Sequence, residues 1–193
     1  MTKDFKLLRK RIIEIISNFS NLIEKYPKEI NNKNQDLIKS FILLCHAELE
    51  SYFENICIKI ISKNKASFDN NNIVTKPLLA LSLMSDRTFK EEDKTLQTAK
   101  ERLDKLYTNY FATIKNNNGI KEKNLKNILP HIGIEMNSID SILLSQLTAF
   151  GEKRGHTAHN AQKVIRRFND EITSINNIIV GLEDLDKKFK ELL

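Results

Sequence analysis

The spacing of apolar and polar residues along the chain predicts a series of amphipathic helices. Between residues 3 and 26, apolar side chains recur every three or four positions, and Pro27 closes the pattern. A longer pattern over residues 35–63 is apolar over a wide arc, which predicts a central helix that packs on more than one side. The Asn-rich residues 64–72 predict a surface loop.

The second half of the chain continues the helical pattern. Pro77 is suited to the first turn of a short helix, and a later apolar pattern stops in an Asn- and Gly-rich turn over residues 116–119. The short segment NLKNILPHIGI follows that turn, and we find no internal repeat or linker. The predicted helices of this half cover residues 77–84, 93–115, 138–153 and 157–193.

Composition supports an all-α fold in one domain. The 193 residues include only 5 Gly and 3 Pro, and 40% are hydrophobic, which suits long helices better than a turn-rich sheet protein. This length is sufficient for one domain with a substantial core. We therefore predict a single domain over residues 1–193, built as a bundle of long antiparallel helices with short additional helices.

Net charge, cysteine spacing and the lengths of apolar runs indicate the expected partner and cellular compartment of the protein. The net charge of +6 fits a polyanionic partner such as RNA, and equally fits an ordinary basic protein. Cys45 and Cys57 lie twelve positions apart on one predicted helix, about 18 Å, and so cannot pair with each other. No apolar run is long enough to span a membrane, and the N-terminus lacks a signal-peptide core. We expect a cytoplasmic protein that does not contact membranes.

The segment FGEKRGHTAHN carries the main candidate chemistry, because it contains two of the four histidines and an arginine. Arg154 and His159 form the pattern RxxxxH. Histidine can take and return a proton near neutral pH, and arginine can hold a phosphate through two charge-assisted hydrogen bonds. RNA cleavage without a metal has these two requirements: a base deprotonates the ribose 2′-hydroxyl, and cations stabilise the attacked phosphate.

Cations around this segment predict a surface for RNA. If a helix runs on from residue 157, His159 shares one face with three cations, opposite the apolar residues of the same helix. Phosphates could follow such a face, although a solvated basic face has the same pattern. The predicted RNA-binding residues are Lys153, Lys163, Arg166 and Arg167.

Arg154 and His159 would not share a face of a regular helix, because five positions place them about 140° apart and about 7.5 Å along the axis. Two solutions are open. Gly151 and Gly155 could break the helix, or the same segment of a second subunit could complete the site across a two-fold axis.

Three stretches resemble a known family. RGHTAHN keeps Arg154, Ala158 and His159 in the register of the RxxxxH motif of HEPN domains. NILPHIGI and HAELESYFENI are similar to segments of the subfamily called RiboL-PSP-HEPN. The resemblance covers the chain from about Leu37 to the last helix.

The resemblance implies an all-helical HEPN-like bundle and a homodimer with a composite active site. It also implies a metal-independent endoribonuclease, without a cofactor, that acts as a toxin or in phage defence, where an antitoxin or another defence protein is a possible partner. Arg154 and His159 carry over as the catalytic pair. The acidic residue of the family corresponds best to Glu50, although helical spacing places Glu48 beside the apolar stripe.

Two positions depart from the family pattern: Gly155 replaces a polar residue, and Asn160 replaces a glycine. His156 lies on the face of His159 and is a candidate catalytic residue in place of the lost polar group. The alternative is a catalytically inactive helical dimer that binds RNA or an acidic protein partner.

The other histidines and the motif content of the sequence do not favour a metal site or another class of enzyme. His156 and His159 have a spacing that could share a metal, but the sequence offers no third and fourth ligand nearby except Glu152. We interpret His131 and His46 as structural histidines, and His46 could add to the cleft beside Glu50. The sequence contains no glycine-rich phosphate loop, GxSxG elbow or paired-cysteine motif.

Overall fold

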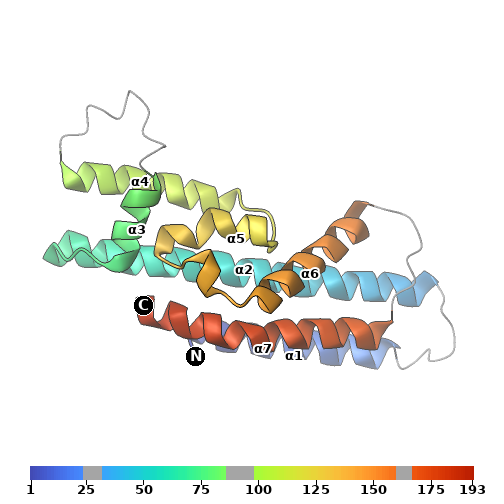
Figure 1. The fold of residues 1–193 in the computed structure, drawn as a ribbon. Coiled ribbons are helices and arrows are strands. Elements are labelled where there is room, and N and C mark those ends of the chain that lie inside the picture. The colour runs from blue at the N-terminus through green and yellow to red at the C-terminus, as the bar shows by residue number, and fades with distance from the viewer. Residues whose placement is uncertain (24–31, 86–97, 160–166) are drawn as a thin grey trace.

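A computed structural model describes residues 1–23, 32–85, 98–159 and 167–193, and these residues form helices and connections without a strand. The predicted all-α helical bundle is therefore confirmed (Figure 1). The α-helices are α1 (Lys3–Ile23), α2 (Asn32–Asn71), α3 (Lys76–Ser85), α4 (Ala99–Lys115), α5 (Glu122–Ile128), α6 (Ser141–His159) and α7 (Phe168–Leu192), and the short 3₁₀ turns are η3 (Pro130–Ile132) and η4 (Met136–Ser138).

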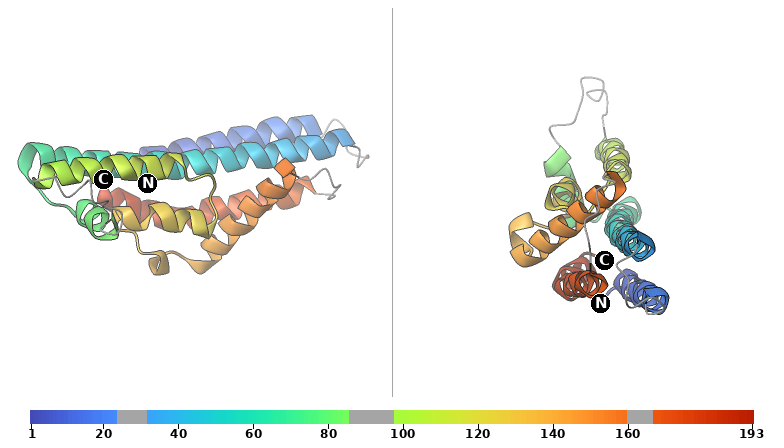
Figure 2. Two further views of the ribbon diagram at one scale, coloured as in Figure 1. Left: turned by 90° about the horizontal axis from the view of Figure 1, so that it is seen from above. Right: turned by 90° about the vertical axis from the view of Figure 1, so that its right-hand side faces the viewer.

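The long helix α2 lies at the centre of the bundle, as its wide apolar arc predicts. It packs against α1, α4, α6 and α7. The helices α1 and α7 run side by side along one flank, whereas α6 crosses the bundle obliquely (Figures 1 and 2). The buried apolar side chains of the described residues form one cluster that includes residues from every α-helix. This packing fixes α6 against α2, where the candidate site lies.

The predicted loop over residues 64–72 is wrong, because α2 continues to Asn71. Two contacts account for the extra turns. Lys65 forms ion pairs of 2.6 Å with Asp69 one turn later and with Asp104 of α4, and the Asn64 amide donates a hydrogen bond to the Leu192 carbonyl. Asn72 then ends the helix in the left-handed region at φ 55°, a conformation that asparagine tolerates better than most residues.

The predicted boundary between the last two helices is also wrong. The helix α6 starts at Ser141 and continues through Gly151 and Gly155 to His159, so neither glycine breaks it. The last helix, α7, begins at Phe168 rather than at residue 157, and Arg167 before it has extended backbone angles. Residues 157–159 therefore belong to α6.

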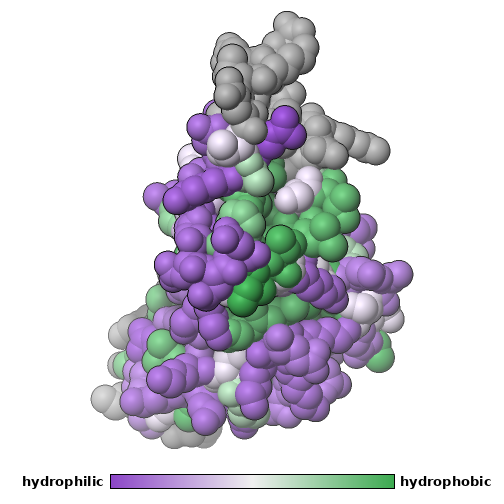
Figure 3. Space-filling view, turned by 90° about the vertical axis from the view of Figure 1, so that its left-hand side faces the viewer, coloured by the Kyte–Doolittle hydropathy of each residue, from purple (hydrophilic) through white to green (hydrophobic). Residues whose placement is uncertain are grey.

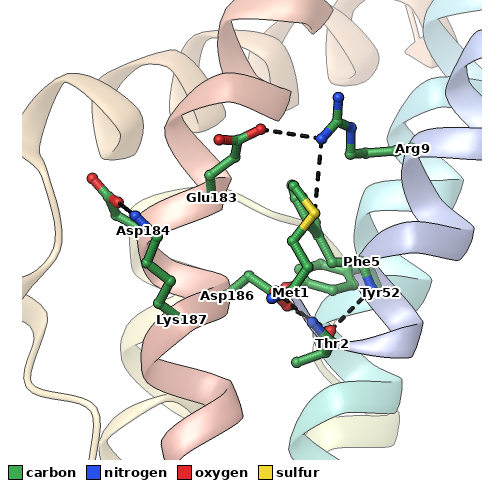
Figure 4. A network of polar contacts seen from close by, with 9 residues as sticks. All are labelled: Met1, Thr2, Phe5, Arg9, Tyr52, Glu183, Asp184, Asp186 and Lys187. Atoms are coloured by element: carbon green, nitrogen blue, oxygen red, sulfur yellow. Dashed lines mark hydrogen bonds and ion pairs between the residues drawn. The ribbon is translucent and has the colours of Figure 1, made fainter.

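A buried carboxylate joins the two ends of the chain (Figure 4). Asp186 of α7 has no exposed surface, and it accepts hydrogen bonds from the Thr2 backbone N–H at 2.7 Å, the Thr2 hydroxyl at 2.5 Å and the Tyr52 hydroxyl at 3.0 Å. The Thr2 hydroxyl in turn accepts from the Phe5 N–H and caps α1. One carboxylate thus connects α1, α2 and α7.

The end of the molecule formed by α3 and the adjoining ends of α2 and α4 carries an apolar groove. Figure 3 shows hydrophobic side chains gathered on this side. The groove has a volume of about 310 Å³ and is lined by residues that include Phe68, Leu79 and Leu103. Phe68 lies 22 residues after His46 on α2, which is about 33 Å along the helix axis. The groove is therefore remote from the part of α2 that packs against α6.

Candidate active site

The helix α6 carries both motif residues in one continuous segment. Arg154 is half-buried, and His159 is the last residue of α6 that the structure describes. The side chain of His159 lies outside what the structure describes. Because α6 is regular through the two glycines, positions 154 and 159 point about 140° apart around its axis. A helix break therefore does not bring the two residues together within one chain.

A histidine and a glutamate of α2 form the floor of the site. His46 is 2% exposed, and its Nδ1 lies 3.7 Å from the Oε2 of Glu50 one turn later. The helices α2 and α6 pack against each other, and the charge of the half-buried Arg154 on α6 acts on His46.

Burial, together with the positive charges of Arg154 and Lys121, lowers the pKa of His46 to about 4, and burial is the largest of these causes. The imidazole is consequently uncharged near neutral pH. An uncharged imidazole between two cations adds no positive charge of its own, but it can donate or accept a hydrogen bond. The burial of His46 fits its structural interpretation, and its position beside Glu50 is the one in which we expected it to add to the cleft.

Lys121 is a residue that our sequence interpretation missed. It precedes α5, and its side chain lies across Gly151 of α6, where a Cβ added to the glycine would approach the Lys121 Cγ to 2.8 Å. Within the described residues, neither Lys121 nor Arg154 has a carboxylate at ion-pair distance. Lys121 thus lies against α6 three positions before Arg154, and the charges of both residues act on His46.

The two candidate glutamates of α2 face different neighbours. The Glu48 Oε1 accepts a hydrogen bond of 2.9 Å from Arg11 of α1, on the outer face of the bundle. Glu50 instead lies beside His46, whose pKa the charge of Arg154 lowers. This placement supports the choice of Glu50 as the acidic residue of the site.

The predicted single helix from residue 157 to the end of the chain is interrupted at Arg167, which has extended backbone angles before α7. Arg167 is exposed, while Lys163 and Arg166 lie outside the described residues. The Lys153 Nζ forms an ion pair of 2.8 Å with Glu171, which is 3% exposed. That pair joins α6 to α7 and favours a structural role for Lys153 over the predicted contact with RNA.

The other histidines and the cysteines have different surroundings. His156 is exposed on α6, close to the motif. His131 stacks on the Tyr110 ring with 5.3 Å between ring centroids, which agrees with its structural interpretation. Cys45 and Cys57 are free and buried, and burial raises the pKa of each thiol to about 12. Among the described side chains, no group of three or more histidines, cysteines or carboxylates is arranged to hold a metal ion, and no described helix is long and apolar enough to cross a membrane.

We expect stability to fall as the pH is lowered from 6.5 to about 4, in part because of His46. In that range the unfolded chain binds a proton at His46 and the folded protein does not, so protons favour unfolding. At about 1.4 kcal/mol for each pH unit, this residue accounts for about 3 kcal/mol. Urea unfolding across pH 4–8 should show a shallower decline for His46→Gln than for the wild type. Parallel curves for the two proteins would show that His46 titrates normally.

Comparison with known proteins gives one match. The family model described as RiboL-PSP-HEPN matches residues 7–191. The match confirms the resemblance of the motif segments and extends it into α1, upstream of Leu37. No curated protein and no solved structure matches the chain.

Proposed function

Because the chain belongs to the RiboL-PSP-HEPN family, we propose that it is a metal-independent endoribonuclease. The family match supports a protein that acts on RNA, and the site residues support cleavage as its chemistry. Arg154 is the phosphate clamp, His159 is the proton-transfer residue, and Glu50 and His156 support them. The positive net charge of the chain is consistent with a polyanionic substrate.

The observation that carries the proposal is the state of Arg154. Its guanidinium is half-buried on a regular helix and has no carboxylate at ion-pair distance among the described residues. A half-buried cation is normally paired, because removing it from water without a partner is costly. A phosphate group of bound RNA would supply that partner through two charge-assisted hydrogen bonds.

The proposed reaction needs a base, an anion-stabilising group and an acid. His159 removes the proton of the ribose 2′-hydroxyl, and the 2′ oxygen attacks the adjacent phosphorus. Arg154 stabilises the negative charge that accumulates on the phosphate oxygens. The bond to the 5′ oxygen then breaks, and a second imidazole returns a proton to that oxygen. The products are a 2′,3′-cyclic phosphate and a 5′-hydroxyl.

We place the site at a two-fold axis between two copies of the chain. One chain separates positions 154 and 159 by about 140° around α6, and the helix is unbroken. Two copies of the segment facing each other would put an arginine and a histidine on both sides of one scissile phosphate. The second copy would also provide the second imidazole that the reaction requires.

The proposal is tested by incubating the purified protein with RNA in EDTA at neutral pH. Fragments with 2′,3′-cyclic phosphate and 5′-hydroxyl ends are expected, because no metal-bound water takes part. A matched 2′-O-methyl RNA should stay intact, since it lacks the attacking hydroxyl. Binding of RNA without cleavage would instead support the inactive helical dimer, and cleavage of the 2′-O-methyl RNA would exclude the mechanism.

Glu50→Gln is expected to slow cleavage about tenfold, whereas Glu48→Gln should leave it unchanged. Only Glu50 lies beside His46 and near Arg154, and the loss of its charge would disturb the hydrogen bonding and electrostatics of the site. Glu48 is the matched control, because the same substitution removes only a half-exposed pair with Arg11. Initial cleavage rates of the three proteins decide the assignment. Equal rates for wild type and Glu50→Gln would remove Glu50 from the site.

We also propose that the protein acts as a toxin or phage-defence effector in the cytoplasm, with an antitoxin or defence-system protein as its regulator. The family supports this role. Two free, buried cysteines are consistent with a reducing compartment. Induced expression in bacterial cells should stop growth and degrade cellular RNA, and normal growth with intact RNA would argue against the role.

A further inference from the structure

We propose that Lys121 binds a phosphate of the RNA substrate beside Arg154, and that Gly151 is the position that holds Lys121 there. The inference rests on the proposed RNA substrate and adds a residue from outside the RxxxxH motif. It follows from three features of the described residues: a fixed backbone at Lys121, the path of its side chain, and the charge around its end.

The backbone at Lys121 is held on both sides. Ile120 before it is fully buried. The Glu122 N–H after it donates a hydrogen bond of 3.1 Å to the Thr148 hydroxyl of α6. The Lys121 carbonyl accepts from the Leu125 N–H at 3.0 Å in the first turn of α5. These contacts hold the Lys121 backbone in a defined position against α6, so its side chain leaves the backbone at a fixed point.

The path of the side chain depends on a glycine. The aliphatic part of Lys121 crosses α6 at Gly151, where a Cβ would lie 2.8 Å from the Lys121 Cγ and 3.5 Å from its Cε. Any other residue at this position would push the lysine away. At Gly155, one turn later on the same helix, an added Cβ would meet no atom within 4 Å. Gly151 is thus required for the path of the Lys121 side chain, whereas Gly155 is not.

The charges around the lysine favour an anion. The Lys121 side chain crosses α6 at Gly151, which lies three positions before Arg154 and therefore on a neighbouring part of the same helix side. The charges of both residues also act on the buried His46. The neighbouring Glu122 is paired with Lys126 at 2.7 Å, and Lys153 on α6 is paired with Glu171. Glu50, at His46, is the carboxylate next to the two cations. Among the described residues, the positive charge of Lys121 and Arg154 is therefore larger than the negative charge beside them. Such an excess of positive charge favours the binding of a phosphate.

The test measures binding of a fluorescein-labelled single-stranded RNA by anisotropy at several salt concentrations. All proteins carry His159→Ala, so the RNA is not cut during the titration. Lys121→Gln is expected to weaken binding about fivefold and to reduce the slope of log K against log salt by about 0.7, the loss of one phosphate contact. Lys121→Arg keeps the charge and should retain most of the affinity.

Two matched pairs of variants separate this role from general charge and from folding. Lys126→Gln removes the same charge from an exposed lysine of α5 and should change binding little. Gly151→Ala should weaken binding in the same direction as Lys121→Gln by displacing the lysine, whereas Gly155→Ala should not. If circular dichroism shows that Gly151→Ala does not fold, the comparison of Lys121→Gln with Lys126→Gln still tests the role of Lys121 in RNA binding.

Equal RNA affinity for the parent protein and Lys121→Gln would overturn the inference, and so would an equal loss for Lys126→Gln. The proposed function is judged separately, by cleavage in the wild-type background. A protein that binds RNA through Lys121 but does not cut it would support the inference and contradict the endoribonuclease.

Discussion

Substitution of Arg154 by alanine is expected to lower kcat/KM for RNA cleavage by about 10³-fold while leaving the midpoint of urea unfolding unchanged. The loss is large because the guanidinium acts on the phosphate charge that develops in the transition state. Stability should be unaffected, since Arg154 makes no ion pair with the described residues. Initial rates on a fluorogenic RNA and urea unfolding curves of both proteins measure the two effects.

The matched control is Arg11→Ala, which removes an arginine of α1 that pairs with Glu48 and Glu14. A half-exposed pair of this kind contributes about 1 kcal/mol or less, and cleavage should be unchanged. His159→Ala should show a loss comparable to that of Arg154→Ala, because a general base contributes about 10²- to 10⁴-fold. Wild-type rates for Arg154→Ala would remove the phosphate clamp from the mechanism.

Substitution of Asp186 by alanine is expected to destabilise the protein by about 3–5 kcal/mol. The carboxylate is fully buried and accepts three hydrogen bonds from Thr2 and Tyr52. Its removal leaves the buried Thr2 N–H and two hydroxyls without their acceptor, and each such group costs about 1–3 kcal/mol. Urea or thermal unfolding, followed by circular dichroism, measures the loss.

Two variants separate the hydrogen bonds from the effect of a changed charge on α7. Asp184→Ala removes a carboxylate two residues away whose side chain is 84% exposed, and its effect should stay within about 0.5 kcal/mol. Tyr52→Phe removes one donor to Asp186 and should cost about 1–1.5 kcal/mol. If Asp186→Ala were no worse than Asp184→Ala, the buried network would not stabilise the bundle.

The periodicity of apolar residues predicted the helices well, because a helix that covers a core must repeat its apolar side every three or four residues. In α1, for example, Phe5, Leu8 and Ile12 follow this spacing, and all three are buried. The error over residues 64–72 has a physical cause. Asparagine and lysine indicate a loop by composition, but contacts of Asn64 and Lys65 with α7 and α4 stabilise the additional turns.

The sequence could propose candidate site residues only where they depend on a local pattern. Arg154 and His159 are five positions apart on one helix, and the sequence shows both. Gly151 was interpreted as a possible helix break because glycine disfavours helices, whereas its role is to admit the Lys121 side chain from a distant part of the chain. Contacts between residues thirty positions apart leave no periodic signal, so Lys121 could not be found in this way.

Asp186 left a signal that we did not use. It falls among Leu182, Leu185 and Phe189, which form the buried face of α7. A carboxylate on such a face is rarely buried unless it is paired or hydrogen-bonded. The sequence therefore indicated that a donor must exist, although it could not indicate that the donors come from Thr2 and Tyr52.

The contact between Thr2 and Asp186 also has a consequence for biosynthesis. The two residues are 184 positions apart, and α7 is translated after the other α-helices of the described chain. At about 5–20 residues per second, α1 waits on the order of ten seconds or more before this partner exists. A nascent chain therefore cannot assemble the complete bundle before α7 has left the ribosome.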